Sequence, residues 1–166
     1  MLKSTQSKKS TRAILDSIRR IVRALRVSSR FVERDMGISG AQLFVLQKLA
    51  DGSALSVNEL ASRTLTHQSS VSVVVSRLIE RGLVLKIVSK KDARKLELRL
   101  SKKGSAFLQR APSTMQERLI SAVEGLSAKQ RAALSDLLEI VVIKSGLVND
   151  APQLFFEDEK EEVKQK

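Results

Sequence analysis

A short polar segment near residue 90 contains four cationic side chains and lies between two apolar runs. Lys90, Lys91, Arg94 and Lys95 stand there with a single carboxylate, that of Asp92. Like charges repel one another at the tip of a hairpin, so a polyanion is the expected partner. We expect the Asp92 carboxylate to hold the Arg94 guanidinium in one orientation, which lowers the entropy lost when Arg94 enters a minor groove.

A helix with an uncluttered polar face precedes this charged segment. Apolar residues recur at helical spacing between Thr66, a suitable N-cap, and Gly82, which suits a left-handed helix end. Small polar side chains on the opposite face approach base edges closely, because nothing bulky holds the helix away from the groove floor. We therefore predict a recognition helix whose DNA-contacting residues are His67, Gln68, Ser69, Ser72, Val73, Ser76 and Arg77.

Two predicted strands frame the charged tip. Residues 83–88 are apolar except for one lysine, and in residues 95–100 charged residues alternate with leucine. Such alternation is typical of a strand with one buried and one wet face. Residues 54–55 are expected to add a short third strand to this wing.

This order of helix, glycine, strand, charged tip and return strand resembles the MarR family of transcriptional regulators. The family signature D-x-R…L-[ST]-x-x-G appears here as Asp92-x-Arg94 and Leu100-Ser101-x-x-Gly104, and the resemblance covers roughly residues 11–146. It implies a homodimer of winged helix-turn-helix subunits that binds pseudo-palindromic double-stranded DNA. It also implies that promoter binding represses transcription and that a small-molecule effector releases the DNA.

The flanking helices are expected to position this unit against a second subunit. An apolar stripe runs from Thr11 to Met36 at helical spacing, and Gly37 is a plausible stop. We interpret the six arginines between the stripe residues as a solvated face rather than a DNA contact. By resemblance to the family, the predicted dimerisation residues are Ile14, Ile18, Ile21, Leu25, Leu134, Leu138 and Val141.

Serine-led capping boxes predict where the other helices begin. Ser39-x-x-Gln42 and Ser56-x-x-Glu59 start two helices, the second of which forms the helix-turn-helix with the recognition helix. Ser101 is a suitable N-cap for the next helix, Pro112 breaks it, and helices restart at Ser113-x-x-Gln116 and Ser127-x-x-Gln130.

The expected fold is mainly α with a small β-wing. It comprises a flexible basic arm (1–10), dimerisation helices (11–37 and 105–146), a winged helix-turn-helix DNA-binding domain (38–104) and an acidic tail (147–166). The tail composition favours disorder. The alternative is a tail that folds back onto the basic DNA face or the partner subunit, with Leu154-Phe155-Phe156 as its anchor.

Composition limits the other functions. The net charge of +12 and a pI of about 10.4 are common in nucleic-acid binders. With no Cys and one His, we expect no metal and no thiol switch, and without a catalytic constellation we expect neither an enzyme nor a cofactor. No apolar run reaches the ~20 residues of a membrane helix, so a cytoplasmic protein is expected. The remaining alternative is a basic protein that coats nucleic acid without choosing a site.

Overall fold

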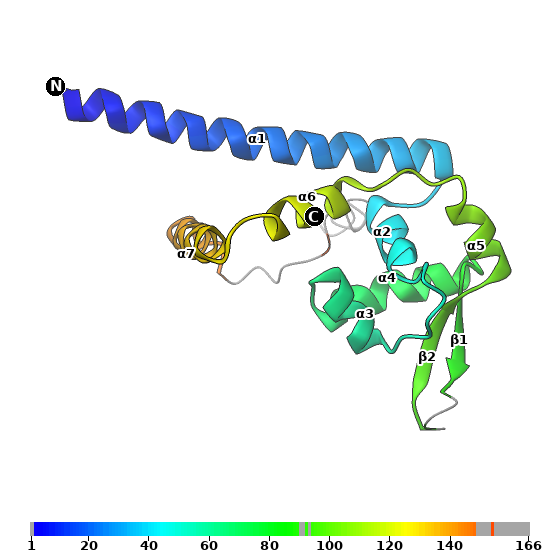
Figure 1. Ribbon diagram of the computed structural model, residues 1–166. Coiled ribbons are helices and arrows are strands. Elements are labelled where there is room, and N and C mark those ends of the chain that lie inside the picture. The colour runs from blue at the N-terminus through cyan, green and yellow to red at the C-terminus, as the bar shows by residue number, and fades with distance from the viewer. Residues whose placement is uncertain (1, 90–91, 93, 149–153, 155–166) are drawn as a thin grey trace, which may run out of the picture.

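Seven helices and two strands make up the part of the chain that the computed structural model describes, which is residues 2–89, 92, 94–148 and 154, with backbone alone for 2–6. This architecture confirms the expected fold of helices with a small β-wing (Figure 1). The elements are α1 (Leu2–Met36), α2 (Gly40–Lys48), α3 (Val57–Thr64), α4 (Gln68–Glu80), β1 (Val84–Val88), β2 (Leu96–Leu100), α5 (Lys102–Leu108), α6 (Met115–Glu124) and α7 (Ala128–Lys144).

The hydrophobic core is built around α2. Seven of its nine residues are buried, and Leu43, Phe44 and Leu46 are among the most enclosed side chains of the protein. The C-terminal end of α1, α3, α4 and α5 contact this helix, and the strands complete the same core with Val84 and Leu98. Burial on all sides of one short helix fixes α3 and α4 as a rigid helix-turn-helix.

The wing is a two-stranded antiparallel sheet. Val84 pairs with Leu100 and Val88 with Leu96, so the tip lies between Val88 and Leu96. The predicted third strand is present only as an isolated bridge, in which Leu55 and Leu98 exchange two backbone hydrogen bonds of 3.0 and 2.7 Å. This bridge ties the base of the wing to the chain that enters α3.

Capping boxes form at three of the four serines for which the motif was predicted: Ser39, Ser56 and Ser127. The predicted N-cap residues of two other helices, α4 and α6, are wrong by one position. His67, not Thr66, is the N-cap of α4, because its backbone is extended (φ −77°, ψ 146°) and its O accepts the helical hydrogen bond from the Val71 N–H at 3.2 Å. Thr114, not Ser113, caps α6, and its hydroxyl accepts from the Glu117 N–H.

Helix α1 is longer than predicted. It begins at Leu2, so the residues expected to form a flexible basic arm continue the helix, since they contain good helix formers and neither Gly nor Pro. It ends at Met36, and Gly37 takes the left-handed conformation with φ of 68°, as predicted. None of the described helices is long and apolar enough to cross a membrane.

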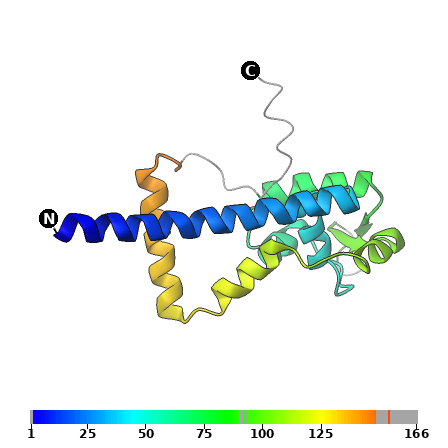
Figure 2. The ribbon, with the colours of Figure 1, turned by 90° about the horizontal axis from the view of Figure 1, so that it is seen from above.

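The C-terminal helices lead away from the core. Residues between α5 and α6 are not helical around Pro112, which confirms the predicted break. Helix α7 runs across the direction of α1 near its N-terminal half (Figure 2) and has no buried residue. The predicted acidic tail lies outside the described residues except for 147, 148 and Leu154, which is 6% exposed and belongs to the core.

Candidate nucleic-acid interface

Helix α4 presents a polar, sterically open face to solvent. Its apolar face is held in the core by Val71, Val74, Val75 and Leu78. On the other side Ser72 and Arg77 are partly buried, and the remaining predicted contact residues are exposed: His67, Gln68, Ser69, Val73 and Ser76. These side chains are short apart from Gln68 and His67, so the helix axis can approach the floor of a major groove.

The wing tip is organised by Asp92, though not as expected. Asp92 accepts a hydrogen bond of 3.1 Å from the backbone N–H of Arg94, and its other oxygen lies 3.9 Å from Lys95 Nζ. Asp92 therefore stabilises a backbone turn instead of making the predicted contact with the Arg94 guanidinium. The turn is closed by a hydrogen bond of 2.9 Å from the Lys95 N–H to Asp92 O. Arg94 and Lys95 are exposed, and Lys90 and Lys91 lie outside the described residues.

The link between α4 and the wing is a close backbone contact. Gly82 has φ of 69°, and the Ser101 hydroxyl donates to Gly82 O at 2.7 Å while accepting from the Gly104 N–H at 2.9 Å. Gly104 leaves no room for a side chain, because a Cβ there would lie 2.1 Å from Leu83 O. This contact sets the direction of the wing relative to α4.

The turn between α3 and α4 contains a residue in an unfavourable conformation. Leu65 ends α3 with φ of 52°, and among the described residues it is the single non-glycine with positive φ. Its side chain is also 68% exposed. A leucine therefore takes the position that glycine often fills in this motif, which explains why the sequence shows no glycine in the turn.

An ion pair joins the loop after α2 to the end of α3. Arg63 Nη1 lies 2.5 Å from Asp51 Oδ2, and Arg63 Nη2 donates to Ser53 Oγ at 3.2 Å. Hydrogen bonds from Ser53 and Arg63 lower the pKa of Asp51 to about 2. Because the carboxylate form is favoured in the fold, these bonds stabilise the protein above pH ~4 and lose their effect as the pH falls towards 2.

Two helices expose apolar faces. Six of the predicted dimerisation residues are exposed within the protomer, whereas Leu25 is buried at 3% exposure and cannot offer a free contact surface. Leu25 was misassigned because it shares the stripe of α1 but lies where that helix already packs within its own protomer. The exposed residues are Ile14, Ile18 and Ile21 of α1 and Leu134, Leu138 and Val141 of α7.

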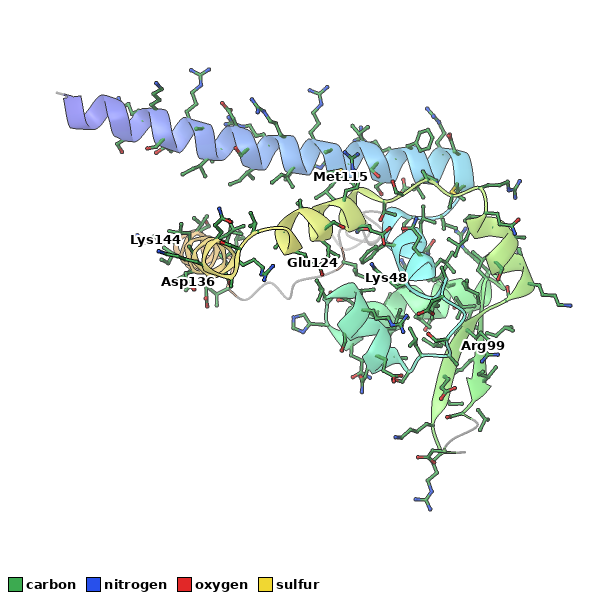
Figure 3. The ribbon with its side chains drawn as sticks, in the orientation of Figure 1. Lys48, Arg99, Met115, Glu124, Asp136 and Lys144 are labelled. Atoms are coloured by element: carbon green, nitrogen blue, oxygen red, sulfur yellow. The ribbon has the colours of Figure 1, made fainter. Side chains whose placement is uncertain are left out.

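A cavity of about 530 Å³ lies between α1 and the start of α6. Met115 faces α1 there (Figure 3), and its N–H donates to Ser28 Oγ at 3.3 Å. Val27 and Phe31 supply the apolar lining, and Arg20, Arg23 and Arg118 supply positive charge. Such a lining fits a small organic anion with an apolar body.

Helix α4 contacts the first strand of the wing, so the recognition helix and the wing lie next to each other (Figure 1). Sequence reasoning missed the pairing of Asp51 with Arg63, for which the signal was weak: an Asp-Gly-Ser turn and an arginine twelve residues later. It also missed the reason for Gly104, whose neighbour Leu83 is twenty-one residues away.

Comparisons with known proteins agree with this geometry. Residues 36–95 match the model of the MarR family. The HTH-type transcriptional regulator FarR of Neisseria gonorrhoeae is 26% identical over 125 residues, which cover 75% of this chain and 86% of FarR. The homoprotocatechuate degradative operon repressor of Escherichia coli is 28% identical over 109 residues, which cover 65% of this chain and 74% of that repressor. A crystallised MepR-like protein complexed with pseudoligands has a TM-score of 0.51 at 25% identity, covering 83% of this chain and 96% of that one.

Proposed function

Because the chain belongs to the MarR family of winged helix-turn-helix transcriptional regulators, we propose that it is a homodimeric repressor of a pseudo-palindromic operator. The observation that carries the proposal is the exposed polar face of α4 beside a basic wing tip. Each α4 would enter a major groove, and two of them would contact half-sites about 34 Å apart. Residues 38–104 form the DNA-binding unit in this proposal, with dimerisation helices at 11–37 and 105–146.

The two parts of the surface have different roles in the proposal. Gln68, Ser69, Ser72 and Val73 read base edges, with Val73 suited to a thymine methyl. His67, Ser76, Arg77 and the wing cations contact phosphates or the flanking minor groove, and Asp92 holds their turn. Changes in the first group should lower operator affinity alone, and changes in the second should lower affinity for all duplexes.

Arg94→Ala should weaken binding to operator and random duplex by similar factors, about tenfold or more. Each dimer loses two phosphate or minor-groove cations, so the slope of log affinity against log salt should fall by about 2. Fluorescence anisotropy at several salt concentrations measures both quantities.

Lys129→Ala is the matched control for Arg94→Ala. It removes one exposed cation from α7, away from the wing, and should leave affinity and slope almost unchanged. If both variants lose affinity equally, the wing tip acts only through net charge and its assigned role is wrong.

We also propose that a small organic anion regulates DNA binding from the cavity between α1 and α6. The support is its apolar and cationic lining, together with the pseudoligand complex of the MepR-like protein. An effector acts by preferring one of two dimer geometries. Among aromatic carboxylates tested by thermal shift, those that raise Tm should also lower operator affinity, and Phe31→Ala should abolish both effects. Binding that survives Phe31→Ala unchanged would move the site elsewhere.

A further inference from the structure

Helix α1 carries as much net positive charge as the DNA-binding unit. Helix α1 has ten Lys and Arg against three Asp and Glu, a net charge of +7 in 35 residues. Residues 38–104 contain twelve Lys and Arg and five Asp and Glu, so their net charge is also +7. DNA contacts through α4 and the wing leave this second cationic surface without an assigned role.

The arginines of α1 form one continuous stripe. Arg12, Arg19, Arg23, Arg26 and Arg30 follow one another at steps of seven, four, three and four residues, which is the spacing of a single helical face. Because α1 is an unbroken helix, the stripe extends about 27 Å at 1.5 Å per residue. All five side chains are exposed. The apolar stripe of Ile14, Ile18 and Ile21 occupies a different face.

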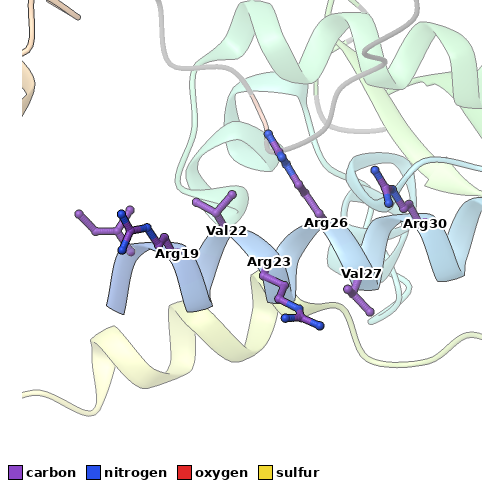
Figure 4. Close-up of a pocket in the computed structure, with 7 residues that line it drawn as sticks. Arg19, Val22, Arg23, Arg26, Val27 and Arg30 are labelled. Carbon is purple, nitrogen blue, oxygen red and sulfur yellow. The ribbon is translucent and has the colours of Figure 1, made fainter. Parts of the chain in front are cut away.

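Few carboxylates neutralise this stripe. Asp16 lies 2.8 Å from Arg19 and 3.8 Å from Arg12, and within the described residues no carboxylate lies within 4.0 Å of Arg23, Arg26 or Arg30. A hollow of about 570 Å³ is lined by residues 18–30 of this helix. Figure 4 shows four arginines around it, with their guanidinium groups spread to both sides of the helix.

We propose that this arginine stripe is a second DNA-binding surface, which holds the phosphate backbone of another duplex segment. Guanidinium groups bind phosphate oxygens in a bidentate manner, and a row of them fits a row of phosphates. The stripe contains no aromatic ring, and the chain has neither Trp nor Tyr, so a duplex fits better than a single strand that needs stacking.

A lipid surface fits the stripe less well. An amphipathic helix binds membranes by burying its apolar face, with Lys and Arg on the opposite, polar face. In the proposed dimer the apolar stripe of α1 (Ile14, Ile18 and Ile21) contacts the partner subunit, so it is not available for burial in a lipid surface. Because α1 and the wing lie on opposite sides of the core (Figure 1), one molecule could hold two duplexes and bring distant sites together. This inference goes beyond the proposed repressor function.

The test removes the stripe and retains the fold. In the fourfold variant Arg19→Gln, Arg23→Gln, Arg26→Gln and Arg30→Gln, glutamine keeps a high helix propensity without charge. A matched control replaces four exposed cations elsewhere by glutamine: Arg110, Lys129, Arg131 and Lys144. Circular dichroism and light scattering establish that both variants keep their helix content and oligomeric state.

The measurement is the capture of a fluorescent random duplex by a second, immobilised duplex in the presence of the full-length protein. The fourfold variant should lower capture at least tenfold, the control at most twofold, and the affinity of the fourfold variant for a single operator duplex should change less than threefold. Two random duplexes serve equally well, so the test does not depend on operator preference and is separate from the repressor proposal.

Four results would overturn the inference. They are absence of capture by the unchanged protein, equal losses in both variants, dissociation of the dimer by the fourfold variant, and unchanged capture by the fourfold variant. Dissociation would mean that the arginines pair with the partner subunit. If capture is unchanged while binding to vesicles of anionic phospholipid is lost, the surface serves a membrane.

Discussion

Replacing Gly104 by alanine should destabilise the protein by about 3 kcal/mol, the upper range for forcing atoms into a packed site. The added Cβ would lie 2.1 Å from Leu83 O and 3.1 Å from Leu83 C. Both are backbone atoms, and Leu83 O also accepts from the Ser101 N–H at 3.0 Å, so neither can move without breaking the link between α4 and the wing. Urea denaturation at a fixed protomer concentration measures the change.

Gly125→Ala is the control for this prediction. Gly125 ends α6 with φ of −68°, and a Cβ there would meet its nearest atom at 3.4 Å. Alanine should therefore be tolerated and could stabilise the protein by about 0.5 kcal/mol, because it restricts the unfolded chain. A loss below 1 kcal/mol for Gly104→Ala would mean that the Leu83 contact does not set the wing direction.

The double variant Leu138→Asp and Val141→Asp should be a folded monomer with operator affinity reduced about a hundredfold or more. The two side chains are 48% and 47% exposed in the protomer, so their replacement removes no core contact. In a dimer the same residues would be buried, and unpaired carboxylates in an apolar interface are costly. A monomer could occupy only one half-site.

Ser135→Asp is the matched control on the same helix. It adds one carboxylate at an exposed polar position of α7 and should leave the dimer intact. Light scattering and circular dichroism distinguish a folded monomer from an unfolded chain. A double variant that remains dimeric and binds operator normally would place the dimer contact on another face.

Local signals in the sequence predicted most of the fold. Capping boxes depend on residues three positions apart, and alternation in residues 95–100 depends on a period of two, so both can be read without tertiary contacts. Thr66 shows the limit of such signals, because it is a residue type that favours the N-cap position, yet α4 is capped one residue later, at His67.

Contacts between distant residues were not predictable from the sequence. Whether Gly104 tolerates a Cβ depends on Leu83, and Leu25 differs from Ile18 and Ile21 because it is already buried within its own protomer. The role of Asp92 was predicted as support for the wing tip, but its use of a backbone N–H rather than a guanidinium depends on the turn conformation. The exposed face of α4 followed from helical period alone.

The most direct test of site-specific repression is competition binding of the purified protein to its own upstream DNA against random duplex at 50 and 200 mM salt. We expect a preference of about a thousandfold or more that persists at the higher salt, because base contacts add to the phosphate contacts shared by both duplexes. Equal affinity for both duplexes, falling together with salt, would contradict the account and identify a protein that coats DNA without choosing a site.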